Sequence, residues 1–228
     1  MTAALILQHG DSGPPALLGE WAGQRGIAYD VHRVDRGGEW PALDHRPFVA
    51  SLGSRHNPAD THMADVAQEL SFLRAAIAAA VPVLGLCYGG QALAVALGGR
   101  VQPAPEPELG WHAIDSDVPW LAPGPWLQWH YHRFVVPPGA RELARSPRAS
   151  QAFAAGPHLG VQFHPESTID IVQGWARNDG ERLAGLGIAD GEALAGAGAH
   201  LAAAARVAAF DLFDAFWERA RASERRAA

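Results

Sequence analysis

Cysteine and long apolar runs are scarce in this sequence. One cysteine, Cys87, occurs among 228 residues. A single cysteine excludes an internal disulfide and a cysteine-rich zinc site, so chemistry at Cys87 would use the free thiolate. No apolar run reaches the ~18 residues that a membrane span needs, and no basic segment precedes the short apolar N-terminus. We therefore expect no membrane partner and a cytoplasmic location, where reducing conditions keep Cys87 available.

Positive charge is also in short supply. The formal net charge is −6, whereas binding to nucleic-acid phosphates favours a basic surface. We therefore expect no nucleic-acid partner. Hydrophobic residues make up 48% of the chain and charged residues 18%, a balance typical of a globular protein with a sizeable core. No internal repeat or linker is evident, so we predict a single domain over residues 1–228.

The first half of the chain alternates short apolar runs with helical periodicity. Val66, Leu70, Leu73 and Ile77 recur at helical steps and mark one face of a helix. Strands separated by helices imply an α/β fold, with a mostly parallel sheet covered by helices on both faces. The predicted strands are residues 3–8, which end in the turn residues 9–11, and residues 27–34, 48–52 and 83–86. The other predicted helices are residues 14–24 and 88–97.

The middle of the chain, about residues 101–161, has a different composition. It is rich in proline, tryptophan and short apolar pieces, which predicts a small antiparallel excursion from the main sheet. The predicted strands are residues 111–114, 126–129, 134–136 and 151–154. A further strand is expected at residues 159–163 and a helix at residues 168–177.

The end of the chain is rich in alanine. Residues 183–199 indicate weakly specified helix and loop. Leu201, Ala205, Ala208, Leu212 and Phe216 then follow at helical steps, which predicts a long helix or a helical pair packed on the sheet.

Cys87 lies between a predicted buried strand and a predicted helix, in a Gly-x-Cys-x-Gly frame with Gly85 and Gly89. This frame is the cysteine form of a nucleophile elbow, whose sharp turn leaves no room for side chains two residues away. The helix N-terminus favours a thiolate, and the amide of Tyr88 is expected to point towards a developing oxyanion. A buried structural cysteine is the alternative for a free thiol, but the frame favours a nucleophile.

A cysteine nucleophile needs a base, and the chain has 11 histidines. His164 is expected at the end of the 159–163 strand, and the carboxyl ends of parallel strands are where sites form. Glu166 would orient the imidazole and complete a Cys-His-Glu triad. Without Cys87, a structural histidine would be the simpler interpretation of His164.

An oxyanion hole needs a second backbone donor besides Tyr88. Gly53 follows the strand at residues 48–52, and a glycine there lets the backbone approach the substrate closely. An ordinary turn glycine fits the same position. The residues alone leave both interpretations of Gly53 open.

Two segments together resemble the class I glutamine amidotransferase domain: residues 85–91 (GLCYGGQ) and residues 160–166 (GVQFHPE). Residues 52–54 fall where that family places its oxyanion glycine. Residues 108–111, 129–134 and 212–216 resemble the stand-alone branch, which is similar to the GMP synthase amidotransferase domain. The resemblance therefore covers nearly the whole chain.

The resemblance implies a flavodoxin-like sheet and the hydrolysis of glutamine to glutamate and ammonia, without a metal or other cofactor. It also implies that the ammonia passes to a synthetase domain or subunit. In this chain it implies Cys87 as nucleophile, His164 as base and Glu166 as the residue that orients the base. Gly53 and Tyr88 match the oxyanion donors.

The resemblance assigns three further positions around the site. Gln91 matches a residue that helps hold the glutamine substrate. The usual Trp-His-Gly-Asp segment ends here in His132, which replaces an acid, and a surface histidine is the alternative to a role in substrate preference. The usual Gly-Gly-Pro loop ends in Arg55, which could reach a substrate carboxylate or be solvated.

Two rival functions stay open on the sequence. A γ-glutamyl peptidase or hydrolase would use the same triad on a different γ-glutamyl amide. A non-catalytic regulatory protein could use the same fold, because a fold does not fix a function.

Overall fold

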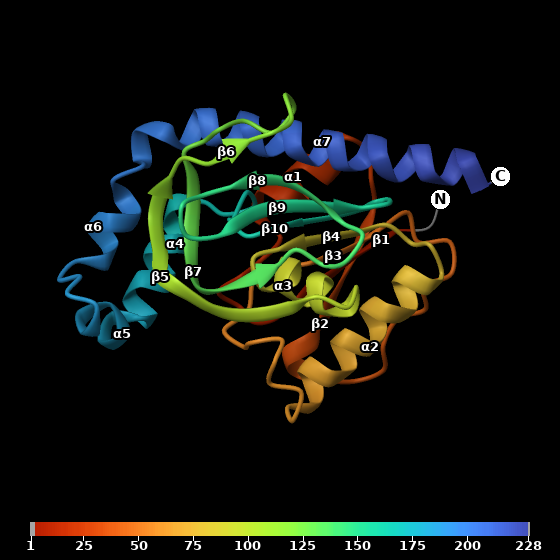
Figure 1. Cartoon of the computed structure of the whole chain (residues 1–228), viewed down its shortest axis with the longest axis horizontal. Helices are drawn as coiled ribbons and strands as arrows, with labels where there is room; N and C mark the ends of the chain where they lie inside the picture. The colour runs from red at the N-terminus through yellow and green to blue at the C-terminus, as the bar shows by residue number, and fades with distance from the viewer. Residues whose placement is uncertain (1–2, 228) are drawn as a thin grey trace.

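The core of the molecule is a sheet of parallel strands. The computed structural model describes residues 3–227. The parallel strands are β1 (Ala4–Gln8), β2 (Tyr29–Arg33), β3 (Val49–Ser51), β4 (Val83–Leu86) and β10 (His158–Val161). They lie side by side in the order β2-β1-β3-β4-β10, which is the 2-1-3-4-5 order of flavodoxin-like folds. The α/β fold with a mostly parallel sheet is confirmed (Figure 1).

The middle of the chain adds antiparallel strands in two places. The strands β9 (Ser150–Ala155), β8 (Arg141–Arg145) and β6 (Asp115–Ser116) extend the main sheet beyond β10. The long strands β5 (Arg100–His112) and β7 (Trp126–Val135) form a separate two-stranded ribbon.

This excursion is larger than the sequence predicted. The segments expected at 126–129 and 134–136 are one strand, β7, and β8 was not predicted. Three prolines in β5 obscured its extent. The ribbon tolerates them because its register shifts between Pro103 and Glu108, and prolines are found mainly at bulges and edges of sheets.

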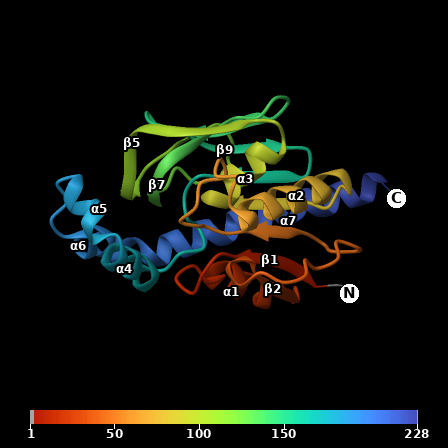
Figure 2. The same ribbon diagram turned by 90° about the horizontal axis from the view of Figure 1, so that it is seen from below.

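Alternation along the strands divides the core into two faces. In β1, Ala4 and Ile6 face one side and Leu5 and Leu7 face the other. The helices α1 (Ala16–Gln24) and α7 (Ala202–Ala227) cover the first side. The helices α2 (Ala64–Ala78) and α3 (Tyr88–Ala96) cover the second. Helices thus lie on both faces, as expected (Figures 1 and 2).

A third apolar cluster joins the β5–β7 ribbon to a group of short helices. These helices are α4 (Ile169–Asn178), α5 (Gly180–Gly185) and α6 (Gly191–Gly196). Leu109 and Trp129 of the ribbon pack with Val172, Leu183 and Ala195 of the helices. The helices form a lobe at one end of the sheet (Figure 2, left). The 3₁₀ turns η1 (Val34–Arg36) and η2 (Ala199–Leu201) complete the elements.

One stretch, Gly191–Ser223, is long and apolar enough to cross a membrane by length and composition alone. The expectation concerned uninterrupted apolar runs, whereas this stretch passes on mean hydropathy, which its many alanines raise although His200 and Arg206 interrupt it. Core helices pass the same test. In this fold Leu212, Phe213 and Phe216 of α7 are fully buried against the sheet.

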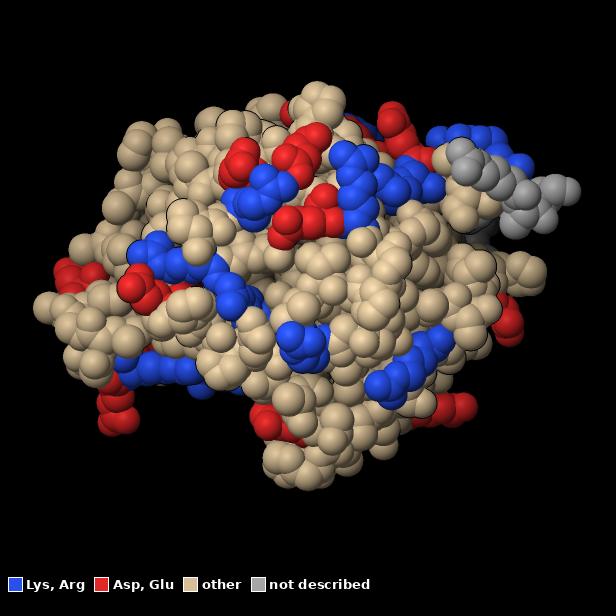
Figure 3. Space-filling view, viewed as in Figure 1, with Lys and Arg blue, Asp and Glu red and all other residues tan. Residues whose placement is uncertain are grey.

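Charge is mixed on the face seen in Figure 3, where basic and acidic side chains are interspersed. Several arginines are neutralised by neighbours. Arg145 lies 3.0 Å from Asp115, and Arg148 lies 2.9 Å from Glu106. Such exposed pairs contribute little to stability, but they interrupt any continuous basic field.

The docking of α7 can be tested by cavity formation. We expect Phe213→Ala to lower the free energy of unfolding by about 3–5 kcal/mol, because a fully buried ring is removed. The control Val207→Ala removes a side chain that is 59% exposed and should change stability by less than about 0.5 kcal/mol. Denaturant unfolding measures both. Equal effects of the two variants would show that α7 is not docked on the sheet.

Candidate active site

Cys87 occupies a strained turn between β4 and α3. Its backbone has φ 53° and ψ −107°, a left-handed conformation that is unfavourable for residues with a side chain. A Cβ at Gly85 would collide with the backbone of Gly89 and Gly90, and one at Gly89 would collide with Ser51. The glycine frame is therefore a steric requirement of the turn. The Cys87 amide donates to the Val161 carbonyl at 2.9 Å, which fixes the turn against β10.

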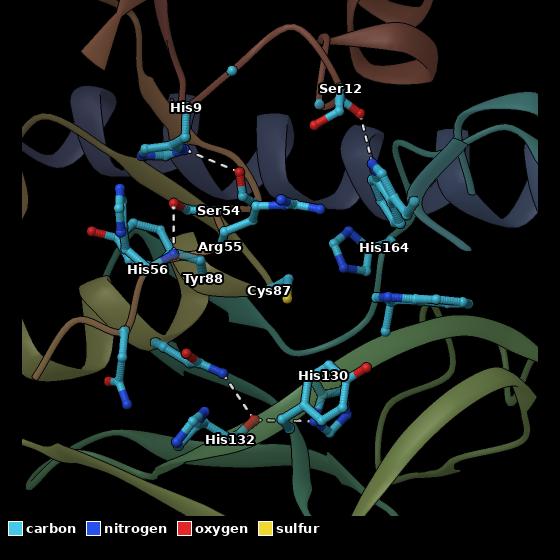
Figure 4. Close-up of a pocket in the computed structure, with 18 of the residues that line it drawn as sticks. His9, Ser12, Ser54, Arg55, His56, Cys87, Tyr88, His130, His132 and His164 are labelled. Atoms are coloured by element: carbon cyan, nitrogen blue, oxygen red, sulfur yellow. Dashed lines mark hydrogen bonds between the residues drawn. The ribbon is translucent and has the colours of Figure 1, made fainter. Parts of the chain in front are cut away.

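His164 lies beside Cys87, with both side chains pointing into one cavity (Figure 4). The Nδ1 atom of His164 lies 2.8 Å from Oε1 of Glu166, and both side chains are about 95% buried. The His164 amide donates to the Leu127 carbonyl of β7 at 2.9 Å. His164 lies three residues beyond the end of β10 at Val161, so the predicted strand end at residue 163 was wrong. Residues 162–163 form a bend that carries the His164 ring towards Cys87.

Protonation of His164 depends on its two neighbours. Burial alone would lower its pKa, but the charge on the Cys87 sulfur, followed by that on Glu166, raises the pKa to about 10. Of the two neighbours, Glu166 is hydrogen-bonded to the ring. The surroundings of the ring therefore favour its protonated form.

Gly53 and Tyr88 lie next to this pair. A Cβ at Gly53 would come within 2.9 Å of Cε1 of His164, so the close approach of this loop requires a glycine. Tyr88 is the first residue of α3, and the first amides of a helix have no partner within it. The two backbone segments thus border the space in front of Cys87.

The cavity in front of Cys87 has a volume of about 750 Å³. Its walls come from the loops after β1 and β3, from the first turns of α3, from β7, and from α4 and α5. These loops follow the carboxyl ends of parallel strands, where ligand sites of open α/β sheets lie. No cluster of three or more metal-ligating side chains occurs among the side chains that the structure describes.

Three further residues singled out in the sequence also line this cavity. Gln91 is buried, and its Nε2 donates to the His132 carbonyl at 2.9 Å. Burial, followed by the charge of Arg182, lowers the pKa of the His132 ring. Arg55 is mostly exposed at the rim and lies 3.4 Å from Asp179. Its guanidinium is therefore only loosely paired.

Buried carboxylates surround the site. Among the residues whose burial is described, the buried acids are Glu69, Glu108 and Glu166. Each lies beside a histidine that lines the cavity: Glu69 is 2.8 Å from His9 and Glu108 is 3.2 Å from His130. Burial of an acid is costly unless the acid is paired. The pairing therefore explains how these acids are tolerated.

Two of these pairs were not predicted from the sequence. His9 was interpreted only as part of a turn after the first strand. A signal for Glu69 was present, because Glu69 falls on the apolar helix face between Val66 and Leu73. A charged residue at such a position is buried only when the fold supplies it with a partner.

The comparisons with known proteins agree with this geometry. The profile described as "Glutamine amidotransferase class-I" matches residues 54–172, just over half of the chain. The chain therefore belongs to the class-I glutamine amidotransferase family. Membership in this family implies glutamine hydrolysis.

Relatives refine this assignment. The chain is 38% identical over 139 residues to the glutamine-hydrolyzing GMP synthase of Thermomicrobium roseum, covering 56% of this chain and 25% of that protein. It is 38% identical over 96 residues to a protein of Ignicoccus hospitalis that is named as one subunit of this enzyme, covering 37% of this chain and 50% of that protein. The chain thus spans between a quarter and half of the length of these two relatives.

A solved structure matches over almost the full length. The glutamine amido transferase from Methylobacillus flagellatus superposes with a TM-score of 0.82 at 28% identity, covering 96% of this chain and 95% of that one.

The pKa of His164 provides a direct test of the geometry. We expect nuclear magnetic resonance titration to show His164 protonated at neutral pH, with a pKa near 10. In Cys87→Ala this pKa should fall, because the main group that raises it is gone. A free histidine has a pKa of ~6.5, so protonation stabilises the fold fully below that pH and the stabilisation is lost as the pH rises. An unchanged pKa in Cys87→Ala would contradict the pairing of the two side chains.

Proposed function

We propose that the chain hydrolyses the side-chain amide of glutamine to glutamate and ammonia through a γ-glutamyl thioester on Cys87. The observation that carries the proposal is the convergence of Cys87 and His164 on one cavity, with Nδ1 of His164 held 2.8 Å from the Glu166 carboxylate. An imidazolium beside the sulfur stabilises a thiolate, the form that attacks a carbonyl carbon.

The first half of the reaction forms the thioester. The Cys87 thiolate attacks the amide carbon, and the carbonyl oxygen becomes an oxyanion. Backbone amides of Tyr88 and of the Gly53 loop stabilise this oxyanion. The imidazolium of His164 donates its proton to the departing nitrogen, so the carbon–nitrogen bond breaks and ammonia leaves.

The second half of the reaction releases glutamate. The neutral His164 ring now takes a proton from water as the water attacks the thioester carbon. The carbon–sulfur bond breaks, and the thiolate and imidazolium are restored. Glu166 holds the ring orientation through both halves. Gln91 would contact the substrate from the cavity wall, with its amide nitrogen already fixed to β7.

The ammonia would then pass to a synthetase partner. The Ignicoccus hospitalis relative is named as one subunit of a GMP synthase, and such a name implies a further subunit. Co-purification of an ATP-dependent synthetase with the tagged chain from its own cells would support this step. Equal glutaminase activity with and without that synthetase would count against it. A reducing compartment such as the cytoplasm would keep Cys87 reduced.

The role of the nucleophile is tested by Cys87→Ala. We expect glutaminase activity to fall by more than about 1000-fold, because no other side chain can form the thioester. The free energy of unfolding should not drop in parallel, since the substitution removes only the packing contacts of a small side chain. Ammonia release, followed by a coupled assay, measures the effect. Full activity in Cys87→Ala would exclude this mechanism.

A second function is favoured by the size of the cavity. Its volume of about 750 Å³ lies in the range that accommodates drug-sized ligands, ~300–1000 Å³, and free glutamine would fill only part of it. A γ-glutamyl peptidase or hydrolase would use the same triad on an amide with a larger leaving group.

Substrate competition separates these two functions. For a glutaminase, we expect kcat/KM with glutamine to exceed that with γ-glutamyl dipeptides by at least about 10-fold, or about 1.4 kcal/mol of transition-state binding. The reverse order would assign the hydrolase function. Failure of Cys87 to react with a glutamine-analogue affinity label would instead favour a non-catalytic protein.

A further inference from the structure

A buried histidine and a buried glutamate lie behind the Gly53 loop, outside the proposed triad. His9 follows β1, and its Nε2 lies 2.8 Å from Oε2 of Glu69 on α2. The other ring nitrogen, Nδ1, lies 3.1 Å from the carbonyl oxygen of Gly53. The His9 side chain is 4% exposed and that of Glu69 is fully buried. Figure 4 shows His9 with its hydrogen bond to this loop at the cavity wall.

The same glutamate contacts the strand that leads into the loop. Oε1 of Glu69 accepts a hydrogen bond from Oγ of Ser51 at 2.7 Å, and Ser51 ends β3 two residues before Gly53. The His9 ring also packs edge-on against the Tyr88 ring, with 4.8 Å between centroids. Glu69 and His9 therefore contact the Gly53 loop, the end of β3 and the ring of Tyr88.

This arrangement leaves no free nitrogen on His9 for proton transfer to substrate. Each ring nitrogen faces an oxygen acceptor, and a histidine donates from both nitrogens when it is protonated. A buried carboxylate is costly unless it is paired. Glu69 is paired with His9 and Ser51, and it does not line the cavity. The pair thus acts on the backbone rather than on the substrate.

The geometry of the peptide group shows what this contact does. A trans peptide is planar, with its carbonyl and its N–H on opposite sides. A donor that fixes the Gly53 carbonyl therefore also fixes the direction of the Ser54 amide. That amide points away from His9. Ser54 itself lines the cavity, and the loop lies close to His164.

We propose that His9 and Glu69 are positioning residues that hold the Gly53–Ser54 peptide in the orientation needed to stabilise the oxyanion. His9 makes the contact, and Glu69 fixes the ring of His9 and the end of β3. The proposal rests on the proposed function, because an oxyanion forms only if a carbonyl is attacked at Cys87.

Two isosteric substitutions separate the two contacts of His9. In His9→Asn the side-chain amide stands near the place of Nδ1, so the bond to the Gly53 carbonyl can remain while the bond to Glu69 is lost. In His9→Gln the amide stands near the place of Nε2, so the bond to Glu69 can remain while the Gly53 carbonyl is released.

We expect opposite effects on activity and stability. His9→Gln should lower kcat roughly 10- to 100-fold with little change in KM, the scale of a small misplacement of a catalytic group. His9→Asn should retain kcat within about threefold and yet be the less stable protein, because Glu69 loses a partner. The control His200→Ala, at an exposed position, should leave both quantities unchanged.

A third measurement separates oxyanion stabilisation from the nucleophile itself. Alkylation of Cys87 by iodoacetamide forms no oxyanion, so its rate should be unchanged in both His9 variants. The proposal is overturned if alkylation slows in proportion to kcat, if both variants lose the same activity, or if the loss follows stability.

Failure of the proposed function has a different signature. The wild-type protein would then hydrolyse neither glutamine nor γ-glutamyl dipeptides. The contact would still be measured by the carbonyl carbon-13 shift of Gly53, which should change in His9→Gln and persist in His9→Asn. Equal shifts in the two variants would overturn the positioning role regardless of activity.

Discussion

The tight turn at Cys87 is the constraint on which the rest of the site depends. A positive φ at a residue with a side chain costs ~1–3 kcal/mol, and the surrounding elements must supply that energy. They do so through close backbone contact: Gly85 meets the start of α3, and Gly89 meets Ser51 at the end of β3. The amide of Cys87 bonds to Val161 of β10. One turn therefore locks three neighbouring strands and a helix into register, and it holds the sulfur at the edge of the sheet where their loops converge.

A second constraint acts at the walls of the cavity, where each of the buried glutamates described above lies beside a histidine. Glu166, Glu69 and Glu108 lie beside His164, His9 and His130. The three pairs have different surroundings. His164 has a second neighbour in Cys87, which raises the pKa of its ring. In contrast, burial outweighs the effect of Glu108 and lowers the pKa of His130. Similar side-chain pairs thus provide one group suited to proton transfer and others suited to holding the walls in place.

The sequence predicted those parts of the molecule in which local pattern and tertiary structure agree. Alternating apolar runs identified β1, β4 and α3, and the glycine frame identified Cys87 as a candidate nucleophile. Prediction failed where contacts distant in sequence decide the structure. The prolines of β5 argued against a strand in the sequence. The strand forms because β5 pairs with β7, a contact that local sequence does not show. His9 resembled a turn residue, and its role depends on Glu69, which is 60 positions away. The position of Glu69 on an apolar helix face indicated that it needs a partner, but no local pattern identified His9 as that partner.

The central claim is that a covalent γ-glutamyl thioester forms on Cys87. It is tested most directly by rapid acid quenching of the protein during turnover with glutamine, followed by peptide mass spectrometry. The account predicts a γ-glutamyl adduct on the peptide that contains Cys87, formed before glutamate is released. Hydrolysis of glutamine at an undiminished rate with no adduct on that peptide, at any quench time, would contradict it.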